Sequence, residues 1–228
     1  MRLLNKTITA IIIFLLLINC QTKKINSLGE YVRISEESKQ HNNNEVNAIL
    51  IKARELRSKK NDFIAYKSYS IGSIRLNKID SNTCPNCNPD DPLFLFWNEN
   101  GKAWIQKSDN CGIFFPIELN NFEITDFVND NFKTIKSEKI KYYSTDKNTF
   151  SMIDHSTFKQ FLIVKSDIEI YNHFDLYNMS NNPKNINYNY NNNLKIVKLD
   201  NMIKKEIKKL DSLSLFKRDL SRCNSLQQ

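Results

Sequence analysis

The chain has 228 residues, of which 40% are hydrophobic and 25% are charged, and its formal net charge is +8. This length is sufficient for one domain with a real hydrophobic core, and no repeat or Gly/Ser/Pro-rich linker divides it. A positive net charge can indicate nucleic-acid binding. Here 26 lysines stand against 7 arginines, beside 32 asparagines. This bias is typical of an AT-rich coding sequence, so we expect no nucleic-acid partner.

The N-terminus has the features of a secretory signal. Arg2 and Lys6 give it a positive charge, and residues 10–18 form an unbroken apolar run. This run is about half of the ~20 residues that a membrane-spanning helix needs. The pattern therefore favours an export signal over a transmembrane helix.

The end of the apolar run, Leu17-Ile18-Asn19-Cys20, resembles the lipobox of bacterial lipoproteins. The resemblance implies cleavage before Cys20, acyl chains on that residue, and attachment to the extracytoplasmic, periplasm-facing side of a membrane. Two or more acyl chains make such an attachment stable. We therefore divide the chain into a signal peptide (1–19), the lipidated cysteine with a polar tether (20–44) and a single folded domain (45–228). The alternative is an uncleaved anchor.

Hydrophobic periodicity predicts a helix and then a sheet in the first half of the domain. In residues 45–60 apolar side chains recur on one helical face, with Asn44 available as N-cap. Aromatic and β-branched residues predict strands over residues 63–69, 71–79, 93–97, 102–107 and 113–119. A short loop ending in Asn100-Gly101 makes the third and fourth of these a hairpin. Pro116 places the last strand at an edge or a bulge.

The second half returns to helix, strands and helix. Residues 122–135 carry an amphipathic helical pattern, and residues 158–164 and 168–171 are predicted strands. Residues 181–193, rich in Asn and Tyr, are predicted to form an exposed low-complexity loop. Residues 201–222 form a predicted helix with a basic outer face, formed by Lys204, Lys205, Lys208 and Lys209. The predicted fold class is α+β, a single domain with a mainly antiparallel sheet and two to three packed helices.

Four cysteines remain besides Cys20, namely Cys84, Cys87, Cys111 and Cys223. Their even number and an exported location favour disulfides, although four cysteines allow three pairings. A bridge from Cys84 or Cys87 to Cys111 would close a loop of about 25 residues and contribute on the order of 3–4 kcal/mol.

Zinc is the weaker alternative for these cysteines. Cys84, Cys87 and Cys111 could supply three ligands, with Cys223, His155 or a distant acid as the fourth. A redox pair resembling thioredoxin is less favoured, because Pro89 and Pro92 leave little room for the helix that lowers a cysteine pKa. We therefore expect no metal and no cofactor.

The histidines and acids do not form a catalytic motif in the sequence. Residues 154–156 (Asp-His-Ser) have the residue types of a hydrolase triad, but adjacent side chains cannot converge on one bond. His173 and Asp175, and likewise Asp167 and Glu169, would share a strand face and could hold a metal or a hydrogen bond. A solvated pair at a strand end is the commoner arrangement. There is no Gly-rich phosphate loop and no HExxH motif.

We predict a lipid-anchored cell-envelope protein that acts as a non-catalytic binding or structural module, with an envelope protein or a small molecule as its partner. The alternative is a zinc- or thiol-dependent envelope enzyme that uses Cys84, Cys87 and Cys111. A third interpretation places the basic C-terminal helix on a membrane surface. A further alternative is that the alternating Asn and Tyr residues of the loop at 181–193 form a sugar-binding surface.

Overall fold

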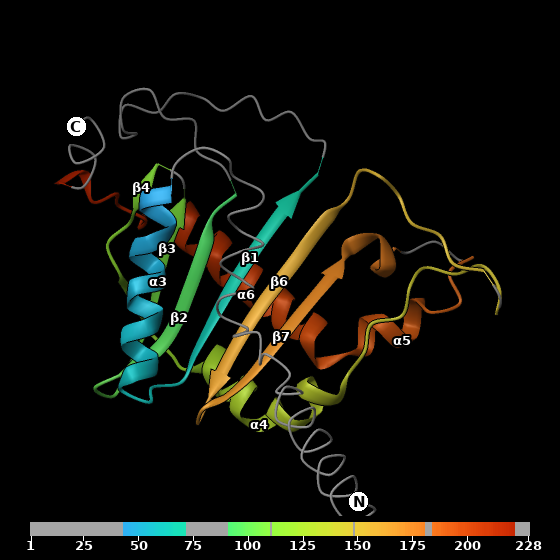
Figure 1. Ribbon diagram of the computed structural model, residues 1–228, viewed down its shortest axis with the longest axis horizontal. Helices are drawn as coiled ribbons and strands as arrows, with labels where there is room; N and C mark the ends of the chain where they lie inside the picture. Colours follow the sequence, from blue (N-terminus) through green and yellow to red (C-terminus); the bar gives the residue numbers. More distant parts are fainter. Residues whose placement is uncertain (1–42, 72–90, 110, 148, 181–183, 222–228) are drawn as a thin grey trace, which may run out of the picture.

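The computed structural model describes residues 43–71, 91–109, 111–147, 149–180 and 184–221. These residues form one open antiparallel sheet in the order β4–β3–β2–β1–β6–β7, with the short β5 also paired to β3 (Figure 1). The strands are β1 (Phe63–Ser70), β2 (Leu93–Glu99), β3 (Lys102–Asp109), β4 (Gly112–Ile113), β5 (Ile117–Leu119), β6 (Thr157–Lys165) and β7 (Ile168–Asp175). The predicted α+β class is confirmed.

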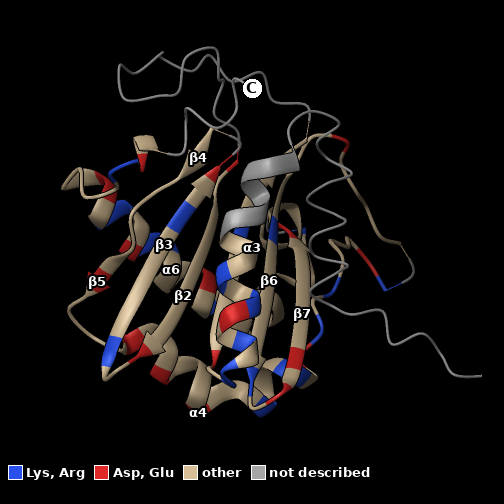
Figure 2. Ribbon diagram, turned by 60° about the vertical axis from the view of Figure 1, so that its left-hand side comes forward, with Lys and Arg blue, Asp and Glu red and all other residues tan. Residues whose placement is uncertain are grey.

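Helices cover both faces of the sheet. Helix α3 lies on one face, while α4 and α6 lie on the other (Figure 2). The helices are α3 (Asn43–Ser58), α4 (Glu123–Ser137), α5 (Tyr188–Asn193) and α6 (Lys195–Ser212), and a short 3-10 helix, η1 (Leu176–Met179), follows β7. In the described part of the chain, none of the helices combines the length and the apolar character that crossing a bilayer requires.

Side-chain alternation along the strands sorts the apolar residues into two cores. On β1, Ile64 and Tyr66 point to the α4/α6 side, while Phe63 and Ala65 point to the α3 side. All four are buried, because β1 lies in the middle of the sheet and is covered on both faces. A strand in such a position needs a continuous apolar run, and residues 63–66 provide it.

The β2–β3 and β6–β7 hairpins each turn through two residues with positive φ. Asn100 and Gly101 have φ values of 54° and 71°, which confirms the hairpin predicted from their sequence. The β6–β7 turn has φ values of 47° at Ser166 and 67° at Asp167. Positive φ at both central residues is the geometry that matches the twist of the flanking strands. Asp167 therefore lies in a turn, and its predicted place on a strand face beside Glu169 is wrong.

Several predicted boundaries were wrong. The strand expected over 113–119 is two short strands separated by Pro116, and its position at the sheet edge is confirmed. Helix α3 begins at Asn43, so Asn44 is not its N-cap. Of the strand expected over 71–79, only Ile71 lies within the described residues, where it forms a bend.

The two largest corrections concern the C-terminal third. Residues 188–193, predicted as exposed loop, form α5, and Asn191 is fully buried there. The helix predicted over 201–222 is α6, which begins six residues earlier and ends at Ser212. Ser214 adopts a positive φ of 51°, and the chain then runs back to β4, where Phe114 forms a bridge with Arg218. The apolar stripe extends past the helix because Phe216 packs against the core from this returning segment.

Candidate functional site

Among the predicted cysteine sites, the described residues include only Cys111. Its side chain is fully buried beside β4, and its backbone N–H donates to Asp109 Oδ1 over 2.9 Å. Cys20, Cys84, Cys87 and Cys223 lie outside the described residues. The pairing of the four cysteines and the zinc alternative therefore stay predictions. In the described ranges, no group of three or more His, Cys, Asp or Glu side chains could hold a metal ion.

The acids and histidines singled out in the sequence do not come together. His155 is exposed, whereas Ser156 bonds through its hydroxyl to Asp175. Asp175 also accepts from the backbone N–H of Tyr177, so it caps η1 and is not a solvated partner of His173. Glu169 pairs with Arg57 of α3, while Asp167 lies in the β6–β7 turn. The expected carboxylate pair is therefore absent.

His173 belongs to an aromatic stack across three strands. Its ring lies 5.3 Å from Phe158 and 6.4 Å from Tyr69, with near-parallel planes, and its Nε2 lies 3.3 Å from the Tyr69 hydroxyl. Burial lowers the pKa of His173, and the nearby Asp175 carboxylate opposes this shift. The neutral ring is therefore favoured, and the stack joins β1, β6 and β7 on the α3 side of the sheet.

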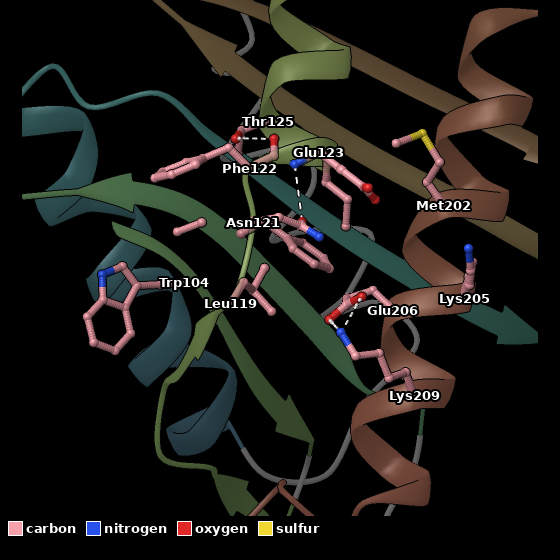
Figure 3. A pocket seen from close by; sticks show the side chains of 13 residues that line it. Trp104, Leu119, Asn121, Phe122, Glu123, Thr125, Met202, Lys205, Glu206 and Lys209 are labelled. Atoms are coloured by element: carbon pink, nitrogen blue, oxygen red, sulfur yellow. Dashed lines mark hydrogen bonds and ion pairs between the residues drawn. The ribbon is translucent and has the colours of Figure 1, made fainter. Parts of the chain in front are cut away.

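A cavity of about 270 Å³, called the α4–α6 cavity below, lies between the sheet, the start of α4 and the middle of α6 (Figure 3). Its apolar lining comes from β2, β3, β5, α4 and α6, as Phe96, Ala103, Leu119, Ile124 and Met202. Figure 3 shows Met202, Lys205, Glu206 and Lys209 of α6 opposite Leu119, Asn121 and Glu123. Trp104 also borders the cavity, but its ring stacks on Trp97 on the α3 side.

Local hydrogen bonds hold the α4 side of this cavity in place. The Asn121 Oδ1 accepts from the Glu123 backbone N–H over 3.3 Å, as in an Asx turn, one residue before the N-cap Phe122. The Thr125 hydroxyl donates to the Phe122 carbonyl and accepts from the Asn98 amide of β2. The bond between Asn98 and Thr125 joins the first turn of α4 to β2, and the sheet therefore helps to hold this wall of the cavity in position.

The charged groups at the cavity differ in their partners. Lys209 donates to both carboxylate oxygens of Glu206, over 3.1 and 3.4 Å. Lys205 and Glu123, both exposed, have no ion-pair partner among residues that the structure describes. As far as the described residues go, the rim therefore offers one ammonium and one carboxylate without an ion-pair partner above an apolar floor.

A second cavity, of about 380 Å³, lies on the other side of the first turn of α4. Two of its three charged residues, Asp62 and Lys165, already hold the β6–β7 turn and α4, and the third is Lys60. Asp62 accepts from the Ser166 backbone N–H over 2.9 Å, and Lys165 donates to the Asn129 carbonyl over 3.4 Å. The first cavity is therefore the better candidate site.

A buried ionisable group lies under α6, and no sequence pattern pointed to it. Lys159 of β6 donates to the Ser68 hydroxyl, and Asp200 of α6 accepts from the Tyr66 hydroxyl over 2.9 Å. Lys204 also pairs with Asp200. These residues do not line either cavity, and their contacts join the sheet to α6.

No family model, no curated protein and no solved structure matches the chain. The chemistry of the site therefore comes from its own residues. Within the described ranges, neither histidine nor cysteine lines the α4–α6 cavity, and its threonine hydroxyl is held by a backbone carbonyl. An apolar floor below two opposite charges is suited to binding a small amphipathic molecule.

The sequence indicated only part of this site. The basic outer face of the last helix correctly included Lys205 and Lys209, but their position at a cavity depends on α4 and β5 lying opposite them. The polar pair Asn120-Asn121, which is typical of a turn before a helix, is a signal that could have pointed to the other wall.

Proposed function

We propose that this chain is a lipid-anchored protein of the bacterial cell envelope that binds a small ligand without transforming it. The charged N-terminus, the apolar run and the lipobox-like Leu17-Ile18-Asn19-Cys20 support the anchor. The α4–α6 cavity, with its apolar floor and two unpaired opposite charges, is the observation that supports binding. A tether in the sequence before α3 would leave the domain free to meet a ligand outside the cytoplasm.

The rim charges favour a zwitterionic ligand. Lys205 would receive a carboxylate and Glu123 an ammonium group, while an apolar side chain enters between Phe96, Leu119 and Met202. A volume of about 270 Å³ is just below the ~300–1,000 Å³ that is usual for ligand pockets, which restricts the ligand to a small molecule. We therefore propose an apolar α-amino acid or a short peptide.

The anchor is tested by the mass of the protein isolated from cells. We expect a chain that begins at Cys20 and carries added acyl chains, because the lipobox places cleavage and acylation there. A Cys20→Ala variant should lose the added mass. An intact starting methionine and an unmodified Cys20 would contradict the proposed location, whatever the cavity binds.

The ligand class is tested by thermal unfolding with L-leucine, L-phenylalanine and their dipeptides. A ligand at a hundred times its Kd stabilises by about 2.7 kcal/mol. In a domain of this size that raises Tm by roughly 5–10 °C. Isovalerate and isoamylamine, which have the leucine side chain with only one charge, should raise Tm much less. If no zwitterion in this set changes Tm, the proposed ligand class is wrong.

Variants then locate the binding. Lys205→Gln removes one charge-assisted hydrogen bond and should weaken binding roughly ten- to a hundredfold. Lys208→Gln is the matched control, because Lys208 is an exposed lysine of α6 that does not line the cavity. Equal losses from both variants would show that the ligand binds elsewhere.

A further inference from the structure

Large apolar side chains are exposed on the segment between α4 and β6. Tyr142, Phe150, Met152 and Ile153 are 59%, 65%, 67% and 42% exposed. Figure 1 shows that this segment projects beyond the β7 edge of the sheet, beside α5. Scattered exposed apolar residues are ordinary, but four within twelve residues of sequence form a patch that needs an explanation.

The backbone below this patch is held by buried asparagines. Asn191 of α5, which is fully buried, accepts from the Lys141 N–H over 3.0 Å and donates to the Lys141 carbonyl over 2.8 Å. Asn178 accepts from the Tyr143 N–H over 2.8 Å. Buried polar side chains with all of these bonds rigidify a structure. The segment is therefore held in a defined position at its base.

This support keeps the apolar side chains from folding back onto the domain. The Tyr143 ring turns inward and stacks on Tyr177 at 4.5 Å, whereas the neighbouring Tyr142 points outward and contacts Phe150 at 5.6 Å. The backbone of Ser151 donates to the Tyr143 carbonyl over 2.9 Å and closes the base of the segment. Exposure of Tyr142 and Phe150 thus follows from a braced conformation.

Over residues 139–154 three lysines stand against two acids, Asp146 and the exposed Asp154, so the charge around the patch is +1. Lys139, Lys141 and Lys147 are all exposed on the same segment. The one acid between them, Asp146, accepts from the backbone N–H and hydroxyl of Thr149. Exposed aromatic and aliphatic side chains together with lysines are the composition that binds the headgroup region of an anionic bilayer.

We propose that this patch, formed by Tyr142, Phe150, Met152 and Ile153 with Lys139, Lys141 and Lys147, inserts into an anionic membrane surface. The apolar side chains would enter the boundary between headgroups and acyl chains, and the lysines would contact lipid phosphates. This membrane contact differs from the predicted one through the C-terminal helix, because Ile203 and Leu210 of α6 are buried against the sheet. It would orient the domain on a membrane to which the proposed lipid at Cys20 attaches it.

The test places a tryptophan in the patch of the protein isolated from cells. Phe150→Trp is mixed with vesicles of phosphatidylcholine and phosphatidylglycerol with brominated acyl chains, and the signal of wild-type Trp97 and Trp104 is subtracted. We expect several-fold stronger quenching than for Phe115→Trp. Phe115 is the matched control, because it is 52% exposed and follows β4 at the opposite edge of the sheet from β7.

Charge variants give a second, independent result. Each lysine near an anionic surface contributes about 1 kcal/mol, so each loss should lower the docked-to-free ratio of the patch roughly fivefold. Lys139→Gln with Lys147→Gln should therefore abolish most of the quenching at position 150, as should vesicles of phosphatidylcholine alone.

Equal quenching of Phe150→Trp and Phe115→Trp would overturn the proposal. The proposal would also be overturned if the tryptophan of Phe150→Trp changed its emission only when envelope protein, and not lipid, was added. That result would assign the patch to a protein partner. Circular dichroism of each variant verifies folding, since these side chains are exposed and their loss should not unfold the domain. Acylation of Cys20 is read separately from the mass of the same sample, so failure of the anchor and failure of the patch are distinguishable.

Discussion

An Arg218→Met variant should lose about 3–5 kcal/mol of unfolding free energy, the cost of leaving one member of a buried ion pair alone. The Arg218 guanidinium donates through both terminal nitrogens to the Asp109 carboxylate, each over 2.9 Å. Their side chains are only 5% and 4% exposed. The guanidinium also lies 4.3 Å from the centre of the Phe114 ring. Methionine keeps part of this packing but leaves the Asp109 carboxylate buried beside the Cys111 N–H alone.

Urea and thermal unfolding measure this effect, with an expected fall in Tm on the order of 10 °C. The double variant Asp109→Asn with Arg218→Met removes both charges and should recover much of the loss. Lys102→Gln is the matched control, because it breaks an exposed ion pair of 2.6 Å with Glu118 and should cost less than about 1 kcal/mol. If Arg218→Met costs no more than Lys102→Gln, the pair does not hold the C-terminal segment.

The elements that could be predicted from the sequence are those whose signal is local. The β2–β3 hairpin follows from Asn100-Gly101 between two apolar runs, and α4 follows from the 3.6-residue period that places Ile124, Val128 and Ile135 on one face. The β6–β7 turn was missed, because Ser166-Asp167 is an uncommon pair for a turn that needs positive φ at both positions. Local patterns therefore predicted the strands of the sheet, but not the conformation of the turn between β6 and β7.

Helix α5 could not be predicted because its stability depends on distant residues. Its sequence, YNYNNN, has low helix propensity. Asn191 nevertheless lies in this helix with its amide bonded to the backbone of Lys141, fifty residues earlier. The same explanation applies to the α4–α6 cavity, whose walls come from β5, α4 and α6. Composition indicated a loop, whereas long-range hydrogen bonds determine a helix.

The C-terminal helix was predicted too long because an apolar stripe does not show which element carries it. Leu210 is buried on α6, but Leu213 and Leu220 are exposed and Phe216 packs from the returning segment. Helix α6 ends at Ser212, Ser214 has a positive φ, and the returning segment is joined to β3 by the ion pair of Arg218 with Asp109. In the sequence, Arg218 cannot be distinguished from a solvated surface arginine.

A Lys159→Met variant should be more stable than the wild type near neutral pH and lose this advantage at high pH. Lys159 is only 4% exposed. Burial lowers its pKa from 10.5 to about 8, against the raising effect of Asp200, while Lys204 lowers it further and Asp91 raises it. A shift of this size corresponds to about 3 kcal/mol. The charged lysine destabilises the folded protein by this amount, partly offset by its hydrogen bond to the Ser68 hydroxyl, at about 1 kcal/mol.

The pH window follows from the direction of this pKa shift. Below pH 8 both the folded and the unfolded chain hold the Lys159 proton, so the full destabilisation is present. Between pH 8 and 10.5 the unfolded chain binds more protons, and wild-type stability therefore rises with pH relative to the variant. We expect Lys159→Met to gain about 2 kcal/mol at pH 7 and to lose this gain above pH 10.5.

Urea unfolding of both proteins across this pH range measures the difference, with Lys208→Met as the exposed control on α6. Lys208→Met should change stability by less than about 0.5 kcal/mol, without a pH-dependent difference from the wild type, because its side chain is solvated in both states. A pH-independent difference for Lys159→Met would mean that the Lys159 ammonium is not penalised by burial. Methionine would then act only through packing and the lost bond to Ser68. A loss of stability at pH 7 would instead show that the attraction between Lys159 and Asp200 outweighs desolvation, and that this lysine stabilises the contact between β6 and α6.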